Sequence, residues 1–506
     1  RAFVYTFKNQ RPVALQLLAT PTHFEETALD AAIYVQDQWT MDRLTLNLGL
    51  RYNDIDMSSP ELVLAPGFFV GQRNVPAAEH IPHWRNLSPR VGAAYDLFGD
   101  GRTAIKGSLG MYPDIIRVSP ANPANLFSLT TNRTWNDTSF GAGDPRSGNF
   151  RPDCELLNPV ANGECGAWSD QNFGRPRLST RNAPDSLEGF NGQFRNWQAS
   201  VNFQHELTQG FALNVGYFRT WYDGFLATDN VAVSGAANFD SFCITAPSDS
   251  RLPGGGGNQI CGLYDLKPAS FGRVDNVVTQ ASNYGDQTQV YNGLDLTLTG
   301  RFGQGGQFSG GLSMGRTVTD NCFLNDNPSV TTAAFLNVLA LPATSTVPRN
   351  SEFCHVAPPW SSGTQLKFLA VYPLPWDLET SAIVQNSPGI PITASYVVSN
   401  AQVREALGRN LSACPSQTVT TCTATYRTEL IPPNTMFEPR LTQVDLRFSR
   451  LFRLGATTRL RGHLDIYNVF NASNVLSMTP TYGAAWKNVA YALSARLLRI
   501  GAQLDF

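Results

Sequence analysis

The sequence predicts an all-β fold, a transmembrane antiparallel up-and-down β-barrel with about 15 strands present. Apolar and polar residues alternate in segments of about ten residues, as in strands with one apolar and one wet face. The segments come in pairs, joined by a very short turn within each pair and by a very long loop between pairs. All the short turns fall at one end of the series, an asymmetry that membrane barrels show and β-sandwiches do not require.

Composition supports a β-rich protein. Only 15% of the 506 residues are charged, while 42 Gly, 32 Pro, 30 Phe, 16 Tyr and 9 Trp indicate many turns and many aromatic strand positions. The net charge of −2 gives no electrostatic reason to expect nucleic acid as a partner. The sequence has no apolar run long enough for a membrane helix. A barrel exposes only alternate residues to lipid, so a mean hydropathy of −0.19 is compatible with strands that cross a membrane.

The expected strands follow one another in pairs along the chain. Two short strands at 1–7 and 12–19 come first. The later pairs are 28–39 with 44–52, 86–96 with 102–112, 194–206 with 211–223, 287–301 with 307–319, 364–372 with 378–385, and 442–452 with 458–471. A single last strand covers 495–506. Segments 331–341 and 401–408 are expected to be short helices within loops.

The alternation also predicts which face each side chain occupies, because a charge on the lipid side is costly. The residues expected to contact lipid are Leu46, Leu48, Val201, Leu213, Leu446, Phe448 and Leu504. Their neighbours Asn47, Asn202, Asn214, Asp445, Arg447 and Gln503 are expected to face the lumen.

The strand count and the strand directions predict whether the barrel closes. A strand count of about fifteen is odd, and segment 1–7 and the last strand both run toward the short turns, so the sequence predicts exposed strand edges rather than a regular closed barrel.

Three stretches carry a resemblance to a known family. They are AIYVQDQWTMDRLTLNLGLRY at 32–52, NLSPRVGAAYDLFGDGRTAIKGSLGMY at 86–112 and IYNVFNASN at 466–474. The sequence resembles the TonB-dependent receptors of the Gram-negative outer membrane, especially their Oar-like branch. The last strand, ending on an aromatic residue, looks like the assembly signal of outer-membrane barrels. The residues of this signal are Leu498, Ile500, Leu504 and Phe506.

The resemblance implies about 22 strands around an N-terminal plug. Neither the plug nor the energy-coupling box is recognisable, so residues 1–506 are expected to be an N-terminally truncated barrel domain. The implied function is energy-coupled uptake of an unidentified extracellular solute. The implied partners are outer-membrane lipid, the barrel assembly machinery, an extracellular ligand and, through the missing N-terminal part, the inner-membrane TonB complex. One alternative is an Oar-like barrel that acts in protein export or surface adhesion. The other is an outer-membrane enzyme, which the sequence does not favour because no nucleophile stands with a His partner.

Eight cysteines all fall in expected extracellular loops. Their order suggests pairing within each loop, because closing a short loop costs little entropy and the periplasm is oxidising. The expected pairs are Cys154 with Cys165, Cys243 with Cys261, Cys322 with Cys354, and Cys414 with Cys422. Eight cysteines allow 105 connectivities, and loop topology makes part of the choice among them.

Other chemical signals are weak, and no catalytic, cofactor or metal site is predicted. His80 and His83 are close in sequence, but a metal site needs further ligands, and two polar loop residues are the preferred interpretation. Segment 254–257 lacks the rest of a phosphate loop and is expected to be flexible. Asp320, Asn321, Asp326 and Asn327 do not fit an EF-hand. The loop aromatics Trp135, Trp168, Tyr264, Phe323, Trp360 and Trp486 could grip a ligand, although packing between loops is the preferred role. The substrate-binding residues are unknown.

Overall fold

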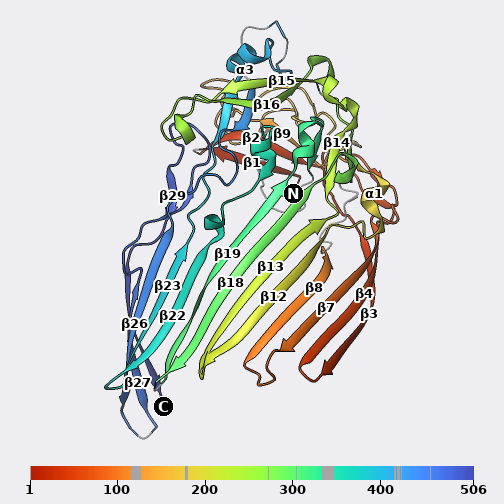
Figure 1. The fold of residues 1–506 in the computed structure, drawn as a ribbon. Helices are drawn as coiled ribbons and strands as arrows, with labels where there is room; N and C mark the ends of the chain where they lie inside the picture. The colour runs from red at the N-terminus through yellow and green to blue at the C-terminus, as the bar shows by residue number, and fades with distance from the viewer. Residues whose placement is uncertain are drawn as a thin grey trace.

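The computed structural model is mostly β (Figure 1). It describes residues 2–8, 10–114, 127–176, 180–271, 273–303, 305–332, 347–414, 417–418, 422, 424–455 and 457–506. Within these ranges, none of the helices has the length and apolar content needed to span a membrane. Most of the predicted helix at 331–341 lies outside the described residues, whereas the helix predicted at 401–408 is present as α3 (Asn400–Leu407).

One sheet of 15 strands dominates the structure, and 13 of them form its continuous path. In sheet order this path is β3 (Thr27–Met41), β4 (Leu44–Ser58), β7 (His83–Asp96), β8 (Thr103–Pro113), β12 (Arg195–Thr208), β13 (Phe211–Asp223), β18 (Thr288–Phe302), β19 (Gly306–Asp320), β22 (Gln365–Leu374), β23 (Leu378–Ser387), β26 (Leu441–Arg453), β27 (Arg459–Tyr467) and β30 (Leu497–Asp505). Two short strands, β11 (Glu188–Phe190) and β21 (His355–Val356), pair with β7 and β19. Neighbours along the path are antiparallel, as the sequence predicts.

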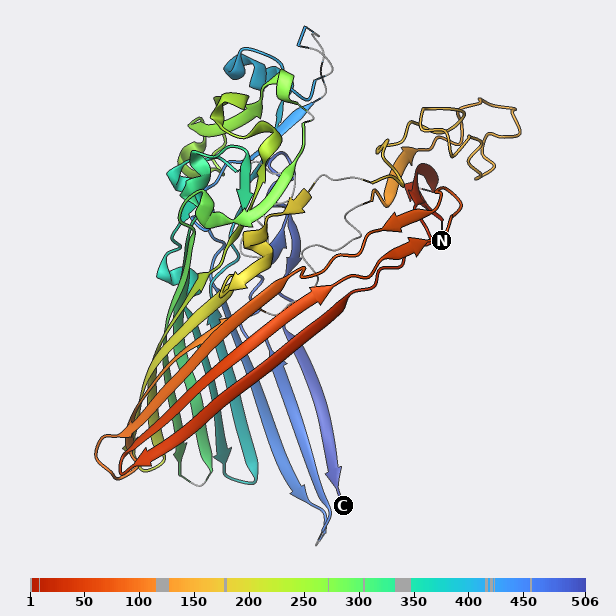
Figure 2. The same ribbon diagram turned by 90° about the vertical axis from the view of Figure 1, so that its right-hand side faces the viewer.

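The sheet is open. In the described part of the chain, β3 pairs with β4 and β30 pairs with β27, so these two strands form the edges of the continuous path. Both edge strands run toward the end of the molecule that carries the short turns (Figure 2). Two strands that run the same way cannot form an antiparallel ladder with each other. The predicted absence of regular closure is therefore found in the structure.

The two predicted N-terminal strands exist, but not as part of the barrel sheet. β1 (Phe3–Lys8) and β2 (Arg11–Leu18) form a separate sheet with β9 (Thr130–Thr134), beside the loop end of β3 and β4 (Figure 2). Their place in the barrel is the part of the prediction that was wrong. Leu15 and Leu17 alternate as in a membrane strand, but they are 1% and 0% exposed and pack against loop residues such as Trp135 and Phe69. The alternation along β2 therefore identified its apolar face correctly, but it could not show that loop residues, and not lipid, cover this face.

Apolar residues form rows across adjacent strands of the large sheet. One row runs through Leu48, Val91, Leu109 and Ala199, and another through Leu446, Ile466 and Leu498. The strand registers place all seven predicted lipid-facing residues on this apolar face and their six polar neighbours on the other. The polar face carries a hollow of about 660 Å³, lined by residues that include Asp295, Thr297, Ser313, Lys367 and Gln385.

Aromatic residues bound the apolar face at both ends. Near the short turns, Phe211, Phe302 and Tyr372 follow one another with ring centroids 6.3 and 5.9 Å apart. Near the long loops, Trp197 stacks on Trp221 at 6.0 Å. Phe211 and Trp221 are ten residues apart along β13, which corresponds to about 34 Å along the strand and about 24 Å of thickness at a tilt of 45°. This matches the apolar band of an outer-membrane barrel, so the aromatic belts mark its two membrane surfaces.

Glycine makes room for two aromatic rings on the apolar face. A Cβ atom on Gly300 would lie 2.4 Å from the Phe211 ring, and one on Gly310 would lie 2.2 Å from the Phe368 ring. Each ring therefore lies over a neighbouring strand where a side chain has been left out. A one-residue shift in register would bring the Phe211 ring against Thr299 or Arg301, so this pair favours a single register.

The four disulfides join Cys154 to Cys165, Cys243 to Cys261, Cys322 to Cys354 and Cys414 to Cys422, with Cα atoms 5.9, 4.1, 4.9 and 5.8 Å apart. These pairs are the same as those expected from loop topology. Leu498, Ile500 and Leu504 lie on the apolar face of the edge strand β30, and Phe506 follows its end. Their role as an assembly signal stays a prediction.

Substitution on the two faces should have opposite outcomes. Leu296→Arg places a charge in the middle of the apolar face and should cost about 2 to 4 kcal/mol. Thr297→Arg, one residue on, points into the polar hollow and should be tolerated. The measurement is the fraction of protein that keeps the faster migration of a folded barrel on an unheated gel. Equal tolerance of the two variants would contradict the assigned faces.

Reduction should affect the loops and not the sheet. Each disulfide restricts one loop and is expected to stabilise it by about 2 to 4 kcal/mol. Treatment with a reductant should speed hydrogen exchange in the cysteine-containing loops, while the strands keep their protection and the gel shift persists. Loss of the gel shift on reduction would show that the loop crosslinks support the barrel itself.

Candidate functional site

Three loops that are far apart in the sequence form a single folded layer above one side of the barrel mouth. They are residues 224–287, 388–440 and 468–496, and we name them the loop cap (Figure 1). Their shared core contains Phe242, Ile244, Ala246, Leu252, Ile260, Leu263, Ile392, Ala394, Val398, Val403, Leu411, Cys414, Tyr426, Leu430, Ile431 and Trp486. Because all three loops contribute to this core, no one of them can move independently without exposing apolar surface.

Local sequence explains the elements of the loop cap. β15 (Phe239–Thr245) and β16 (Gln259–Leu266) form a hairpin, and β24 (Ser395–Ser399) pairs with β25 (Thr425–Glu429). α3 begins with a capping box, in which the Ser399 hydroxyl oxygen accepts a hydrogen bond from the backbone N–H of Gln402, and the Gln402 side-chain oxygen accepts one from the backbone N–H of Ser399. It ends at Gly408, whose φ of +75° suits a glycine C-cap.

The turn at 254–257 belongs to this cap and corrects a prediction. All four glycines have positive φ, and Asp249 and Gly257 donate backbone hydrogen bonds across the turn at 2.9 and 3.2 Å. A Cβ atom on Gly256 would lie 2.0 Å from the Pro247 carbonyl oxygen. The glycines therefore allow a tightly packed turn rather than the flexible linker that the sequence suggested.

Arg251 is the polar link between two loops of the cap. Its guanidinium pairs with Asp249 at 2.7 Å and donates hydrogen bonds to the carbonyl oxygens of Trp486 and Gly483 at 3.2 and 3.3 Å. Tyr482 donates its hydroxyl to the same Asp249 carboxylate at 3.0 Å. The Arg251 side chain, supported by backbone and Tyr482 hydrogen bonds, holds the pKa of Asp249 well below its usual range. Burial, then Asp249, raises the pKa of Tyr482, which therefore remains a donor near neutral pH.

A second charged link joins α3 to the β15–β16 hairpin. Arg409 pairs with Asp240 at 2.7 Å and with Asp265 at 2.6 Å. Asp265 also accepts hydrogen bonds from the backbone and hydroxyl of Ser412 at 3.0 Å. Arg409 follows directly after α3, and its guanidinium forms ion pairs with two carboxylates of one hairpin. It therefore fixes the orientation of α3 relative to that hairpin.

The predicted aromatic residues mainly support packing. Trp135 and Trp486 are each 1% exposed and Phe323 is 9% exposed, so none of them offers a free face to a ligand. Trp360 is 40% exposed, with the Arg316 guanidinium 5.1 Å from the centre of its ring. Of these residues, Trp360 is the one best placed to meet a solute entering from outside.

The loop residues considered for calcium also serve the fold. Asp320 accepts a hydrogen bond from the backbone of Cys322 at 2.9 Å and lies 2.9 Å from His355 Nδ1. Asn327 donates to the Phe323 carbonyl at 2.7 Å. These contacts shape the start of the loop that the Cys322–Cys354 disulfide closes.

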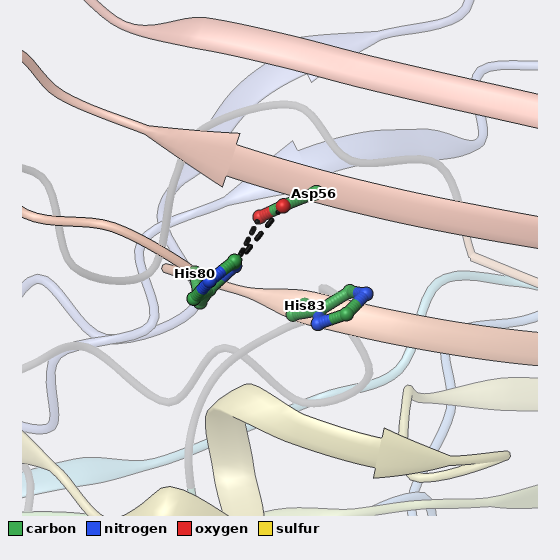
Figure 3. A group of neighbouring side chains, drawn as sticks. All are labelled: Asp56, His80 and His83. Atoms are coloured by element: carbon green, nitrogen blue, oxygen red, sulfur yellow. Dashed lines mark hydrogen bonds and ion pairs between the residues drawn. The ribbon is translucent and has the colours of Figure 1, made fainter.

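The structure brings a third group to the histidine pair. His80 Nδ1 lies 3.0 and 3.1 Å from the two carboxylate oxygens of Asp56, and the rings of His80 and His83 stack with centroids 5.3 Å apart (Figure 3). His83 Nε2 lies 3.0 Å from Asp54 Oδ1. The potential ligand atoms of Asp56, His80 and His83 all fall within 4.8 Å of one another. The sequence could not show this cluster because Asp56 and His83 meet through the register of β4 and β7.

The Asp249–Arg251 pair predicts a pH dependence for the loop cap. The pKa of Asp249 is lower in the folded state than its usual 3.8, so the pair stabilises the cap above about pH 4 and this contribution is lost as pH falls further. Hydrogen exchange of residues 246–258 and 479–488 should therefore be constant from pH 7 to about 4, after correction for intrinsic rates, and rise below it. Asp249→Asn should show the faster exchange already at pH 7.

Asp144→Asn is the matched control for this experiment. Asp144 pairs with Arg146 at 2.6 Å with the same two-residue spacing, and the Arg146 side chain lowers the pKa of Asp144 to about 2. It lies in another loop and should leave the cap peptides unchanged. An effect of Asp144→Asn equal to that of Asp249→Asn would rule out a local role for the Asp249 pair.

Comparisons with known proteins address the fold. A family model described as "Outer membrane beta barrel domain" matches residues 10–485. No match is found among curated proteins. Among solved structures, the outer membrane transporter YddB from Escherichia coli gives a TM-score of 0.43 at 9% identity over 97% of this chain and 55% of its own. The ferric-catecholate import receptor Fiu from E. coli K12 gives 0.42 at 10% identity over 100% of this chain and 53% of its own.

The siderophore receptor PiuA from Acinetobacter baumannii gives 0.41 at 9% identity, over 98% of this chain and 44% of its own. The chain thus spans about half the length of these solved proteins. The family model covers most of the 506 residues, as the resemblance to TonB-dependent receptor barrels predicts. The chain therefore belongs to the outer membrane beta barrel domain family and is a protein of the Gram-negative outer membrane.

Proposed function

We propose that this chain is the barrel domain of a TonB-dependent receptor that captures an extracellular solute with its loops and takes it up through the outer membrane. The observation that carries the proposal is the loop cap: three distant loops share one core at the mouth of a sheet whose inner face is polar. Loops joined in this way keep a fixed surface toward the outside. Binding surfaces of this kind lose little conformational entropy when a ligand docks.

The polar face offers a path below the loop cap. Arg447 pairs with Asp465 there, and the Asp465 side chain is 3% exposed. Gln443 donates to Asp445 on the same face at 3.0 Å. Charged and amide groups along this wall would allow a hydrated solute to pass. Energy coupling through the inner-membrane TonB complex is part of the proposal and would involve residues outside these 506.

Surface adhesion or export is the second candidate, and one observation favours it. The β1–β2–β9 sheet stands beside the mouth with Tyr5 and Phe7 exposed at 40% and 49%, and the Phe150 ring of a neighbouring loop, 57% exposed, lies with its centroid 6.4 Å from that of Phe7. Exposed aromatic residues on a sheet are suited to protein contact. An enzymatic role has less support, because the hydroxyl–imidazole pair Thr103–His205, 2.8 Å apart, lies beside the short turns and away from the mouth.

Energy-dependent uptake tests the proposal. Purified protein is first screened against ferric catecholate and pyoverdine siderophores, a cobalamin and a maltodextrin, with hydrogen exchange of the loop cap as the readout. Uptake of the radiolabelled compound that protects the cap is then measured in cells with and without a protonophore. We expect the protonophore to abolish uptake, because TonB-dependent transport draws on the inner-membrane proton gradient.

Arg251→Ala should weaken binding of the selected compound about tenfold, equivalent to about 1.4 kcal/mol, because it unlinks two loops of the cap. Arg146→Ala removes a similar Asp–Arg pair in another loop and is the matched control. Protonophore-resistant uptake would contradict the transport role. Adherence of the cells to a surface that is lost on Tyr5→Ala and Phe7→Ala, with no uptake of any compound, would favour the second candidate.

A further inference from the structure

We propose that Asp56, His80 and His83 form a binding site for a divalent transition metal ion of the Zn²⁺ type on the outer wall of the barrel. Asp56 and His83 are direct partners in the ladder between β4 and β7. Asp56 lies six residues beyond Leu50 on the same face of β4, or about 20 Å further along the strand. The site is therefore above the apolar band, in water, and separate from the loop cap.

The backbone brings the third ligand into place. Residues 59–82 connect β4 to β7, and the ladder continues into this loop through hydrogen bonds of Met57 with Pro82 and of Ile81 with Met57, at 2.9 and 2.8 Å. His80 comes just before this contact and has a φ of +58°. That left-handed conformation is uncommon for a residue with a side chain, and here it accompanies a ring that lies against Asp56 (Figure 3).

The distances suit an ion of the size of Zn²⁺. Bonds of about 2.0 to 2.2 Å in a tetrahedral site place neighbouring ligand atoms about 3.4 Å apart. His80 Nδ1 is 3.0 Å from Asp56 Oδ2, and the ligand atoms of all three residues lie within 4.8 Å of one another. Side-chain movements of about 1 Å would bring the three groups to bonding distance.

Asp54 contacts one of the proposed ligands and would hold it in place, as carboxylates commonly do for histidine ligands of metal sites. It lies 3.0 Å from His83 Nε2, which leaves Nδ1 of the same ring as the nitrogen available to an ion. A carboxylate that is hydrogen-bonded to one nitrogen of an imidazole fixes the orientation of the ring, and it makes the other nitrogen a stronger metal ligand. Asp54 and Asp56 are on the same face because they are two residues apart in one strand.

The set of donors determines the class of ion. Two imidazoles and one carboxylate favour Zn²⁺ and similar first-row ions over Ca²⁺ and Mg²⁺, which take mostly oxygen ligands. The His80, His83 and Asp56 side chains are 56%, 31% and 31% exposed, so an ion can reach them from the external medium. Three protein ligands leave one position for water or an outside ligand. A bound ion would fasten the end of loop 59–82 to the barrel wall.

The experiment uses the full protein purified in detergent from outer membranes without a histidine tag. Binding of Zn²⁺ is measured by calorimetry, and Co²⁺ is used in parallel because a tetrahedral Co²⁺ site absorbs strongly in the visible. We expect one ion per chain, a tetrahedral Co²⁺ spectrum, and loss of both signals in His80→Ala/His83→Ala. Asp54→Asn should keep the stoichiometry and weaken affinity by about 10- to 100-fold.

His355→Ala is the matched control, because His355 also contacts a carboxylate, that of Asp320 at 2.9 Å, without a second histidine beside it. It should bind Zn²⁺ like the unaltered protein. Migration on unheated gels shows that each variant is folded. The proposal is overturned if the unaltered protein gives no one-to-one Zn²⁺ binding, if folded His80→Ala/His83→Ala binds as well as the unaltered protein, or if Ca²⁺ competes at equal concentration.

Discussion

The membrane-spanning part of the structure depends on one interaction, the hydrogen-bonded pairing of each strand with its neighbours, which satisfies backbone polar groups within lipid. Each of the central strands of the path pairs with a neighbour on both sides, so its backbone groups are satisfied without water. This pairing fixes the register, and the register in turn fixes which side chains meet hydrocarbon. Within each of the two rows, from Leu48 to Ala199 and from Leu446 to Leu498, apolar residues lie side by side because the strands that carry them are in register.

Beyond the lipid the same strands are free to carry other chemistry. On β4, the face that bears Leu46 and Leu48 continues to Asp54 and Asp56, so one face of the strand contacts lipid at one end and carries polar side chains at the other.

The loops are ordered by other interactions. They have no sheet to hold them, and they gain order from a shared apolar core, four disulfides and charged links such as Arg409 with Asp240 and Asp265.

Much of the barrel could be predicted from the sequence, because alternation is local and each membrane strand carries it on its own. The faces of Leu213 and Asn214 follow from parity alone, and loop topology gave the same cysteine pairs that the structure contains. The alternation does not show which sheet a strand joins. For that reason β1 and β2 were predicted in the barrel, whereas they form a separate sheet with β9. The alternation also could not give the contact of Asp56 with His80 or the three-loop core around Trp486, because both depend on which distant segments meet.

The shared core of the loop cap has a consequence for the order of folding. Arg251 and Trp486 are 235 residues apart in the chain, yet they are in direct contact. Contacts of such high sequence separation form late, because the entropy of closing the intervening chain must be offset first by nearer contacts. Between these two residues in the sequence lie β18, β19, β22, β23, β26 and β27. Once these strands have paired, the length of free chain between Arg251 and Trp486 is much shorter. The cap can therefore complete only on strands already in register, which makes a closed cap a sign that the wall beneath it has been correctly assembled.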